Sequence, residues 1–346
     1  MKIEREECWK LKGLKWSVSV LVEQTLPYLA NVWIDEFYLN PEACVLVFRH
    51  GRKRLREIFG DNVTHQGVSP PPISYGHVAC LGCGIAFPEN SEPYAKPAFN
   101  SLDEGIGALE REVDFRENPL FNHYLKMHSC LNDAFPSEKI SFSGFGWEGP
   151  ITSAGLLRGQ GFFSDIHREP KKTERFLELV TASIVKFIHF TMRINGEAKV
   201  DPYSGGLCDD FASYIPPSIW PKFVIPYWDQ YYRGITSGKR VVHCENLSPG
   251  HLRYLADVGI SFYEPSVSPR LNPQIIRENT NIPFSWLHPP FKLVLMTKEE
   301  VRDWVMQVAS MGVEQIWVEV DRFLCEGDNP SKIATFVNTC KEIATE

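Results

Sequence analysis

The second half of the chain alternates between two hydrophobic patterns. Short apolar runs typical of strands alternate with longer segments in which apolar residues recur every three to four positions, as on a helix face. The predicted strands are residues 140–145, 240–244, 260–263, 284–287 and 315–320. The predicted helices are residues 172–195, 217–235, 249–258, 272–279, 298–311 and 330–345. Strict alternation requires parallel strands with crossover helices, and a closed eight-stranded α/β barrel is the commonest solution at this size.

The first 135 residues follow no such alternation. Helical spacing is found at residues 41–59, which begin with Pro41, and at residues 101–112, which begin with a capping-box pattern. The sequence therefore predicts one domain over residues 1–346. Residues 1–135 form an N-terminal elaboration that includes the first strand region, and residues 136–346 form the main barrel.

Composition is that of an ordinary globular protein. Of 346 residues, 43% are apolar and 23% are charged, so a large core can form without disulfide bonds. The net charge of -7 and the lack of a dense Lys/Arg face argue against nucleic acid as a partner. A charged amino terminus and the lack of an apolar run of about 18 residues argue against a signal peptide or membrane span. Nine scattered cysteines fit a reducing cytoplasm.

Three residues at predicted strand ends are candidate metal ligands. His243 and Glu245 lie two positions apart, so the alternation of a strand places them on one face, and Cys325 follows a later strand. One imidazole, one carboxylate and one thiolate leave a fourth position open, as in catalytic zinc sites. Taken singly, His243 can also be a core histidine and Cys325 a buried thiol.

Two further segments carry candidate substrate contacts. Asp209 and Asp210 are neighbouring acids that can hold a proton or orient a substrate, and their alternative role is to cap a following helix. The Gly-rich segment 144–153 allows close backbone approach to a ligand, or only a tight turn. We therefore predict Asp209 and Asp210 as catalytic residues. Gly149 and Thr152, with Tyr203 from the run Tyr203-Ser-Gly-Gly206 that precedes the two acids, are the predicted substrate-binding residues.

The order of these motifs resembles one known family. The segments that carry the resemblance are Gly149-Pro-Ile-Thr-Ser-Ala154, Leu157-Arg-Gly159, Asp209-Asp210-Phe-Ala212, Pro226-Tyr227, the strand ending at His243, and Cys325. They are similar to the uroporphyrinogen decarboxylase superfamily, and within it to the cobalamin-linked zinc methyltransferases. The resemblance implies a TIM-type (β/α)8 barrel whose site lies at the carboxyl ends of the strands. It also implies a zinc cofactor and a partner corrinoid protein that carries cobalamin.

The chain departs from the methyltransferase pattern at one position. Those enzymes carry His-x-Cys and a later Cys, whereas Glu245 stands here in place of the first Cys. A carboxylate donates less electron density than a thiolate, so the metal would be a harder Lewis acid suited to an oxygen-bearing substrate. The sequence thus predicts methyl transfer between a small methylated compound and cobalamin, with a methoxylated compound as the leading donor and O-demethylation as the reaction.

A uroporphyrinogen decarboxylase-like carboxy-lyase is the alternative. Such an enzyme would act without metal, through Asp209 and Asp210. The decarboxylases carry a Met-Arg-Gln-Ala-Gly-Arg run that holds the substrate carboxylates, and this chain has only Arg49-His-Gly-Arg52 in a differently built segment. Without clustered arginines, the substrate carboxylates would be buried without cationic partners. The cost of removing them from water disfavours this alternative.

Overall fold

The computed structural model describes residues 11–12, 14–64 and 66–345. The charged amino-terminal segment considered above, with Cys8, lies outside the described residues. Within the described part of the chain, no helix is long and apolar enough to cross a bilayer.

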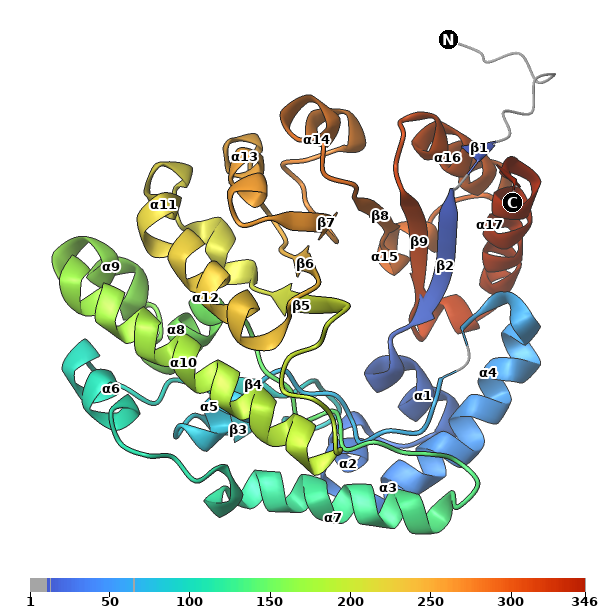
Figure 1. Cartoon of the computed structure of the whole chain (residues 1–346). Coiled ribbons are helices and arrows are strands. Elements are labelled where there is room, and N and C mark those ends of the chain that lie inside the picture. The colour runs from blue at the N-terminus through green and yellow to red at the C-terminus, as the bar shows by residue number, and fades with distance from the viewer. Residues whose placement is uncertain (1–10, 13, 65, 346) are drawn as a thin grey trace.

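Six strands are joined by parallel pairing. They are β2 (Lys15–Val20), β5 (Ser204–Cys208), β6 (Lys239–His243), β7 (Ile260–Glu264), β8 (Ser285–His288) and β9 (Gln315–Val320). Two three-stranded sheets have the orders β5-β6-β7 and β2-β9-β8, and a parallel bridge between Tyr263 and Phe284 connects β7 to β8. The strands lie toward the centre of the molecule, with helices outside them (Figure 1). The protein is an α/β protein with parallel strands, as predicted.

Two extended segments lie between β2 and β5. Ile73 and Phe145 form a parallel bridge, and the N–H of Ile73 donates to the carbonyl of Gly144 at 2.7 Å. On one side, Thr64 donates to the carbonyl of Val18 in β2 at 3.0 Å. On the other, the loop after Phe145 reaches β5, because the N–H of Gly149 donates to the carbonyl of Cys208 at 2.6 Å.

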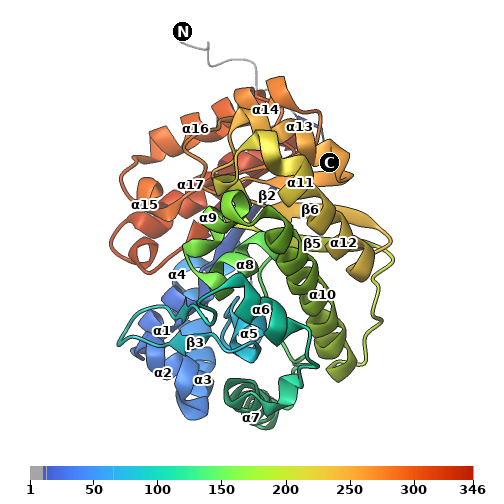
Figure 2. The same cartoon turned by 90° about the vertical axis from the view of Figure 1, so that its left-hand side faces the viewer.

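The N-terminal half contributes helices that gather at one end of the molecule (Figure 2). Its helices are α1 (Val22–Ala30), α2 (Ile34–Leu39), α3 (Pro41–Leu46), the π-helical turn η1 (Val47–Gly51), α4 (Arg52–Phe59), α5 (Gly76–Cys80), α6 (Leu102–Leu109) and α7 (Pro119–Ala134), with the short η2 (Gly60–Asn62) and η3 (Phe115–Glu117). Strands β3 (Gly84–Ala86) and β4 (Tyr94–Lys96) form an antiparallel hairpin there.

Helices of the second half connect and cover the parallel strands. They are α8 (Pro150–Arg158), α9 (Gly161–Arg168), α10 (Pro170–Ile194), α11 (Trp220–Phe223), α12 (Ile225–Ile235), α13 (Pro249–Asp257), α14 (Pro273–Asn279), α15 (Pro290–Leu293), α16 (Lys298–Ser310) and α17 (Asn329–Ile343), with η4 (Asp210–Tyr214), η5 (Pro217–Ile219) and η6 (Phe323–Cys325). Strands β1 (Leu11–Lys12) and β10 (Ala344–Thr345) pair in parallel.

Local sequence explains where several of these helices begin. Proline at the first turn starts α8, α10 and α17, where its missing N–H costs nothing and its fixed φ suits the helix. Thr297 and Glu300 form a capping box at the start of α16. Such start signals depend only on nearby residues and can therefore be found in the sequence. The predicted positions of α10, α13, α14, α16 and α17 are confirmed.

Some predicted elements differ from the structure. Residues 140–145 form no strand and contribute only the bridge at Phe145. The predicted helix at residues 217–235 is broken into η5, α11 and α12, because the backbone at Val224 leaves the helical region. The bounds of β2 and β5 were not predicted. Their polar or glycine-rich sequences, Lys-Trp-Ser-Val-Ser-Val and Ser-Gly-Gly-Leu-Cys, lack the continuous apolar run expected of a buried parallel strand.

Candidate metal centre at the strand ends

The register of the sheets brings three polar side chains together. Cys208, the last residue of β5, pairs with His243, the last of β6, and His243 pairs with Glu264, the last of β7. Residues paired across parallel strands point to the same face of the sheet. A row of thiol, imidazole and carboxylate therefore ends these three strands. On the neighbouring sheet, Glu319 of β9 pairs with Ser19 of β2 near their carboxyl ends.

Cys208, Asp210 and His243 form a group that could hold a metal ion. One ligand atom from each lies within 4.8 Å of the others, and all three residues are half-buried. Asp210 Oδ1 is 3.6 Å from His243 Nε2, and its Oδ2 is 3.9 Å from Cys208 Sγ. Sulfur, nitrogen and oxygen donors of this kind suit zinc, and three protein ligands leave a position for substrate.

The structure places the predicted ligands differently. His243 belongs to the group, but among the described residues Glu245 and Cys325 do not join it. The strand β6 ends at His243, so the alternation that would have put Glu245 on the same face does not continue beyond it. Glu245 instead donates its backbone N–H to Asp210 Oδ1 at 2.8 Å.

Cys325 lies beyond the end of its strand. β9 ends at Val320, and Cys325 is the last residue of the following turn η6. Its Sγ lies 3.5 Å from the carbonyl of Asp321. Burial, with the nearby carboxylates of Asp321 and Glu326, raises the pKa of the Cys325 thiol to about 12. Cys208, which the sequence did not single out, supplies the sulfur of the group.

Glu264 fixes the orientation of the imidazole. Glu264 Oε2 contacts His243 Nδ1, and Glu264 Oε1 accepts the N–H of Ser266 at 2.6 Å. Burial lowers the pKa of His243, but the carboxylates of Glu264, Asp210 and Glu245 outweigh it and raise the pKa to about 9. A carboxylate on Nδ1 leaves Nε2, the nitrogen that faces Asp210, as the atom available to a metal.

Asp209 connects the end of β5 to α8 and to Trp228 through hydrogen bonds. It is fully buried, and its carboxylate accepts the N–H groups of Ile151 and Thr152 in the first turn of α8 at 3.2 and 2.6 Å. It also accepts the indole N–H of Trp228 at 2.6 Å. Burial raises the pKa of Asp209 to about 6, against the opposing effect of these hydrogen bonds. The alternative considered from the sequence, a cap on a following helix, is not found: the Asp209 side chain makes no cap hydrogen bond to η4, and it accepts instead from the first turn of α8, earlier in the chain.

Glu148 is a site residue that sequence reasoning missed. Burial, together with the charges of Asp210 and Asp209, raises the pKa of Glu148 to about 8, while contacts with Ser74 and Cys208 act in the opposite direction. Its Oε2 is buried and has no hydrogen-bond partner among the described residues. The raised pKa favours the protonated form of the Glu148 carboxyl group beside the Cys208 thiol. Burial, together with Glu148, Asp210 and Asp209, also raises the pKa of the Cys208 thiol.

Comparison with known proteins identifies the family. A model of the uroporphyrinogen decarboxylase (URO-D) family matches residues 75–312, more than half of the chain. The chain belongs to the uroporphyrinogen decarboxylase family. The matched segment contains Cys208, Asp210 and His243 and ends before Cys325. No sequence among the curated proteins matches this chain.

The fold of this chain is similar to that of a solved structure. A methyltransferase from Methanosarcina mazei superposes with a TM-score of 0.67 over 96% of this chain and 94% of that chain, at 15% sequence identity. At that identity the likeness establishes the fold alone.

Of the three predicted substrate-binding residues, Gly149 and Thr152 lie beside the site and Tyr203 lies away from it. Gly149 lies against Asp209, so that a Cβ at this position would be 2.5 Å from the Asp209 side chain. The Thr152 hydroxyl is buried and accepts the N–H of Phe211 at 3.0 Å. These two residues build the wall of the site. Tyr203 precedes β5 and is 81% exposed, at the opposite end of the sheet from His243, so the structure does not place it in this site.

The edge of the sheet is strongly acidic. Burial and the charges of Glu23, Glu264 and Glu245 raise the pKa of Glu319 to about 7, while His243 acts in the opposite direction. Among the strongest charge effects on Glu148, His243 and Glu319, none comes from Lys or Arg. The site therefore favours cations and repels anions.

This acidity should be visible in the pH dependence of stability. Because the folded-state pKa of Glu319 is raised from 4.5 to about 7, its contribution to stability is fully present below pH 4.5 and is lost as the pH rises through 7. We expect Glu319→Gln to remove this loss, so that the variant is more stable than the wild type at pH 8 but equal to it at low pH. Urea unfolding of metal-free protein between pH 5 and 8 checks this. Parallel pH profiles for both proteins would contradict it.

Proposed function

We propose that this protein is a zinc-dependent methyltransferase that moves a methyl group between a small methylated compound and cobalamin on a partner corrinoid protein. The six parallel strands, with the extended segments at Ile73 and Phe145 between β2 and β5, would form one closed TIM-type (β/α)8 barrel over residues 1–346. The fold shared with a methyltransferase and the grouping of Cys208, Asp210 and His243 support the proposal.

The observation that carries the proposal is the metal-ligating group at the carboxyl ends of the strands, where enzymes of this architecture place their sites. Cys208, Asp210 and His243 would hold the zinc, with Asp210 acting as a ligand in place of the proton-handling role predicted from the sequence. When bound, zinc supplies a Lewis acid that polarises an atom next to the transferred methyl group.

The remaining residues position these ligands. Glu264 keeps His243 Nε2 turned toward Asp210, and the backbone N–H of Glu245 holds Asp210 Oδ1. Asp209 joins β5 to the start of α8, which fixes the loop that contains Glu148 and Gly149. The proposed reaction thus depends on ligand geometry that three neighbouring strands and one helix define.

Charge narrows the class of methyl donor. We keep a methoxylated compound as the donor, with the restriction that it is neutral or cationic, because the strongest charge effects on Glu148 and His243 come from carboxylates. An anion about 4 Å from one unpaired carboxylate would be repelled by up to about 4 kcal/mol at the effective dielectric of a protein surface.

Methyl transfer from a matched set of donors tests both points. Zinc-loaded protein is incubated with cob(I)alamin and with 4-methoxybenzylamine, 4-methoxybenzyl alcohol or 4-methoxybenzoate, and formation of methylated corrinoid is followed by absorbance. We expect transfer from the amine and the alcohol at rates at least tenfold above the benzoate. Equal rates for all three would contradict the charge argument. No transfer from any methoxylated or methylated-amine donor, with release of carbon dioxide from a carboxylated substrate in the presence of chelator, would favour the decarboxylase alternative.

A further inference from the structure

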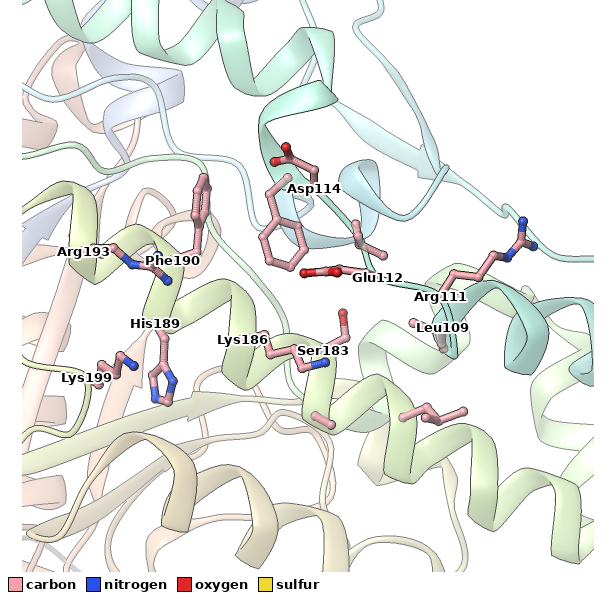
Figure 3. Close-up of a pocket in the computed structure, with 14 residues that line it drawn as sticks. Leu109, Arg111, Glu112, Asp114, Ser183, Lys186, His189, Phe190, Arg193 and Lys199 are labelled. Atoms are coloured by element: carbon pink, nitrogen blue, oxygen red, sulfur yellow. The ribbon is translucent and has the colours of Figure 1, made fainter.

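A cavity bordered by α10 shares no lining residue with the group Cys208, Asp210 and His243 at the strand ends. Its volume is about 380 Å³, and its walls come from the segment after α6, residues 109–115, and from the C-terminal half of α10 (Figure 3). A neighbouring cavity of about 430 Å³ shares Asp114, Phe190 and Arg193 with it. Neither is lined by a residue of the metal-ligating group, so this is a separate site.

The cavity walls are rich in cations. Two acidic residues, Glu112 and Asp114, line the two cavities together with five cationic ones, namely Arg111, Arg116, Lys186, Arg193 and Lys199. Asp114 is already engaged, because its carboxylate accepts the N–H of Arg116 at 2.9 Å as the cap of η3. The cavity therefore has a net positive charge in a protein whose overall charge is -7.

These cations differ from those in the first half of α10. Lys172 pairs with Asp103 at 2.7 Å, and Arg175 pairs with Glu110 at 3.0 Å. No carboxylate in the described part of the chain comes within ion-pair distance of Lys186, Arg193 or Lys199. The half of the helix that borders the cavity thus carries cations that form no ion pair within the described part of the chain.

The rest of the wall suits a flat, partly polar molecule. The rings of Phe115 and Phe190 pack with centroids 5.4 Å apart, and the Arg116 guanidinium lies 5.8 Å from the Phe190 centroid. Ser183 also lines the cavity; it is almost fully buried, and its hydroxyl is hydrogen-bonded to Nε2 of the buried His77 at 3.0 Å. Aromatic faces and a positioned hydroxyl beside unpaired cations are features of sites for organic anions.

We propose that this cavity binds a small organic anion, whose phosphate or carboxylate group is held by Lys186, Arg193 and Lys199 and whose flat apolar part lies against Phe190. The site is independent of the proposed methyl transfer. The acidic strand ends would repel such an anion, so the ligand of this cavity differs from the neutral or cationic donor proposed for the metal centre.

Titration calorimetry of the full chain with phenyl phosphate tests the site. We expect the double variant Lys186→Ala/Arg193→Ala to bind phenyl phosphate at least tenfold more weakly than the wild type. Lys171→Ala is the matched control, because Lys171 is an exposed cation in the first turn of the same helix and outside the cavity. It should bind like the wild type. Phenol, which has the ring without the charge, should not saturate the protein.

Two comparisons complete the experiment. Benzoate and inorganic phosphate, titrated separately, distinguish a carboxylate ligand from a phosphate ligand and measure the contribution of the ring. Thermal melting establishes that each variant is folded. Equal affinity of the wild type and the double variant for every anion would overturn the proposal, as would undetectable binding of both phenyl phosphate and benzoate at millimolar concentration.

Discussion

Asp209→Ala is expected to lower the free energy of unfolding by about 3 to 5 kcal/mol, because it leaves three buried donors without an acceptor. Those donors are the N–H groups of Ile151 and Thr152 and the indole N–H of Trp228. Trp228 is fully buried, so water cannot replace the lost carboxylate there. Urea unfolding of metal-free protein, followed by circular dichroism, measures the effect.

The neighbouring acid provides a matched control. Asp210 is half-exposed and accepts one backbone N–H, that of Glu245, at 2.8 Å. Asp210→Ala should therefore cost about 1 kcal/mol in the absence of metal. Similar losses in the two variants, or a loss below about 1 kcal/mol in Asp209→Ala, would show that Asp209 does not anchor α8 to the site.

His243→Ala is expected to abolish methyl transfer, and Glu264→Gln to reduce it by roughly 10- to 100-fold. The first change removes the only nitrogen ligand of the group, whereas the second keeps the ligand and loosens its orientation. Initial rates of corrinoid methylation with 4-methoxybenzylamine and saturating zinc measure both effects.

His288 offers the control for this comparison. It also ends a strand, β8, but its ring packs on Trp304 of α16 with centroids 4.6 Å apart, in the outer helix layer. His288→Gln should leave the rate within a few-fold of the wild type even where it lowers stability. Rates in His243→Ala that match those in His288→Gln would remove His243 from the reaction.

Hydrophobic periodicity predicted much of the fold because it is a local property. Residues 315–320 alternate between two faces, and the structure has β9 at those bounds. β5 escaped prediction because Gly205 and Gly206 provide no side chain to mark a face. β2 escaped it because serines at positions 17 and 19 face the same way as Trp317 and Glu319 of β9, and a polar pattern of this kind is typical of a surface segment.

Only part of the candidate metal centre could be predicted. The sequence indicates where strands end, but it does not indicate which residues of neighbouring strands pair with each other. His243 was found as a histidine at the end of an apolar run. The grouping of Cys208 and His243 depends on the pairing of β5 with β6, a tertiary feature that no local pattern specifies. The run Cys208-Asp209-Asp210 was the sequence feature that could have indicated the other ligands. It contains two potential metal ligands, Cys208 and Asp210, on either side of the buried Asp209.

Adjacent residues of the same type took different roles for the same reason. Asp209 faces α8 and Trp228, and Asp210 faces His243, because the chain turns from β5 into η4 between them. Glu264 was overlooked for a different reason. It is one of many acids in the sequence, and only its position at the end of β7 gives it contact with an imidazole.

Zinc content of three proteins tests the metal centre most directly. The wild type, Cys208→Ser and Cys325→Ser are loaded with zinc, freed of excess metal by gel filtration and analysed for metal. We predict about one zinc per chain in the wild type and in Cys325→Ser, and loss of most of it in Cys208→Ser. Zinc retained in Cys208→Ser but lost in Cys325→Ser would contradict the assignment and support the ligand set predicted from the sequence, and a wild type without zinc would contradict the metal centre itself.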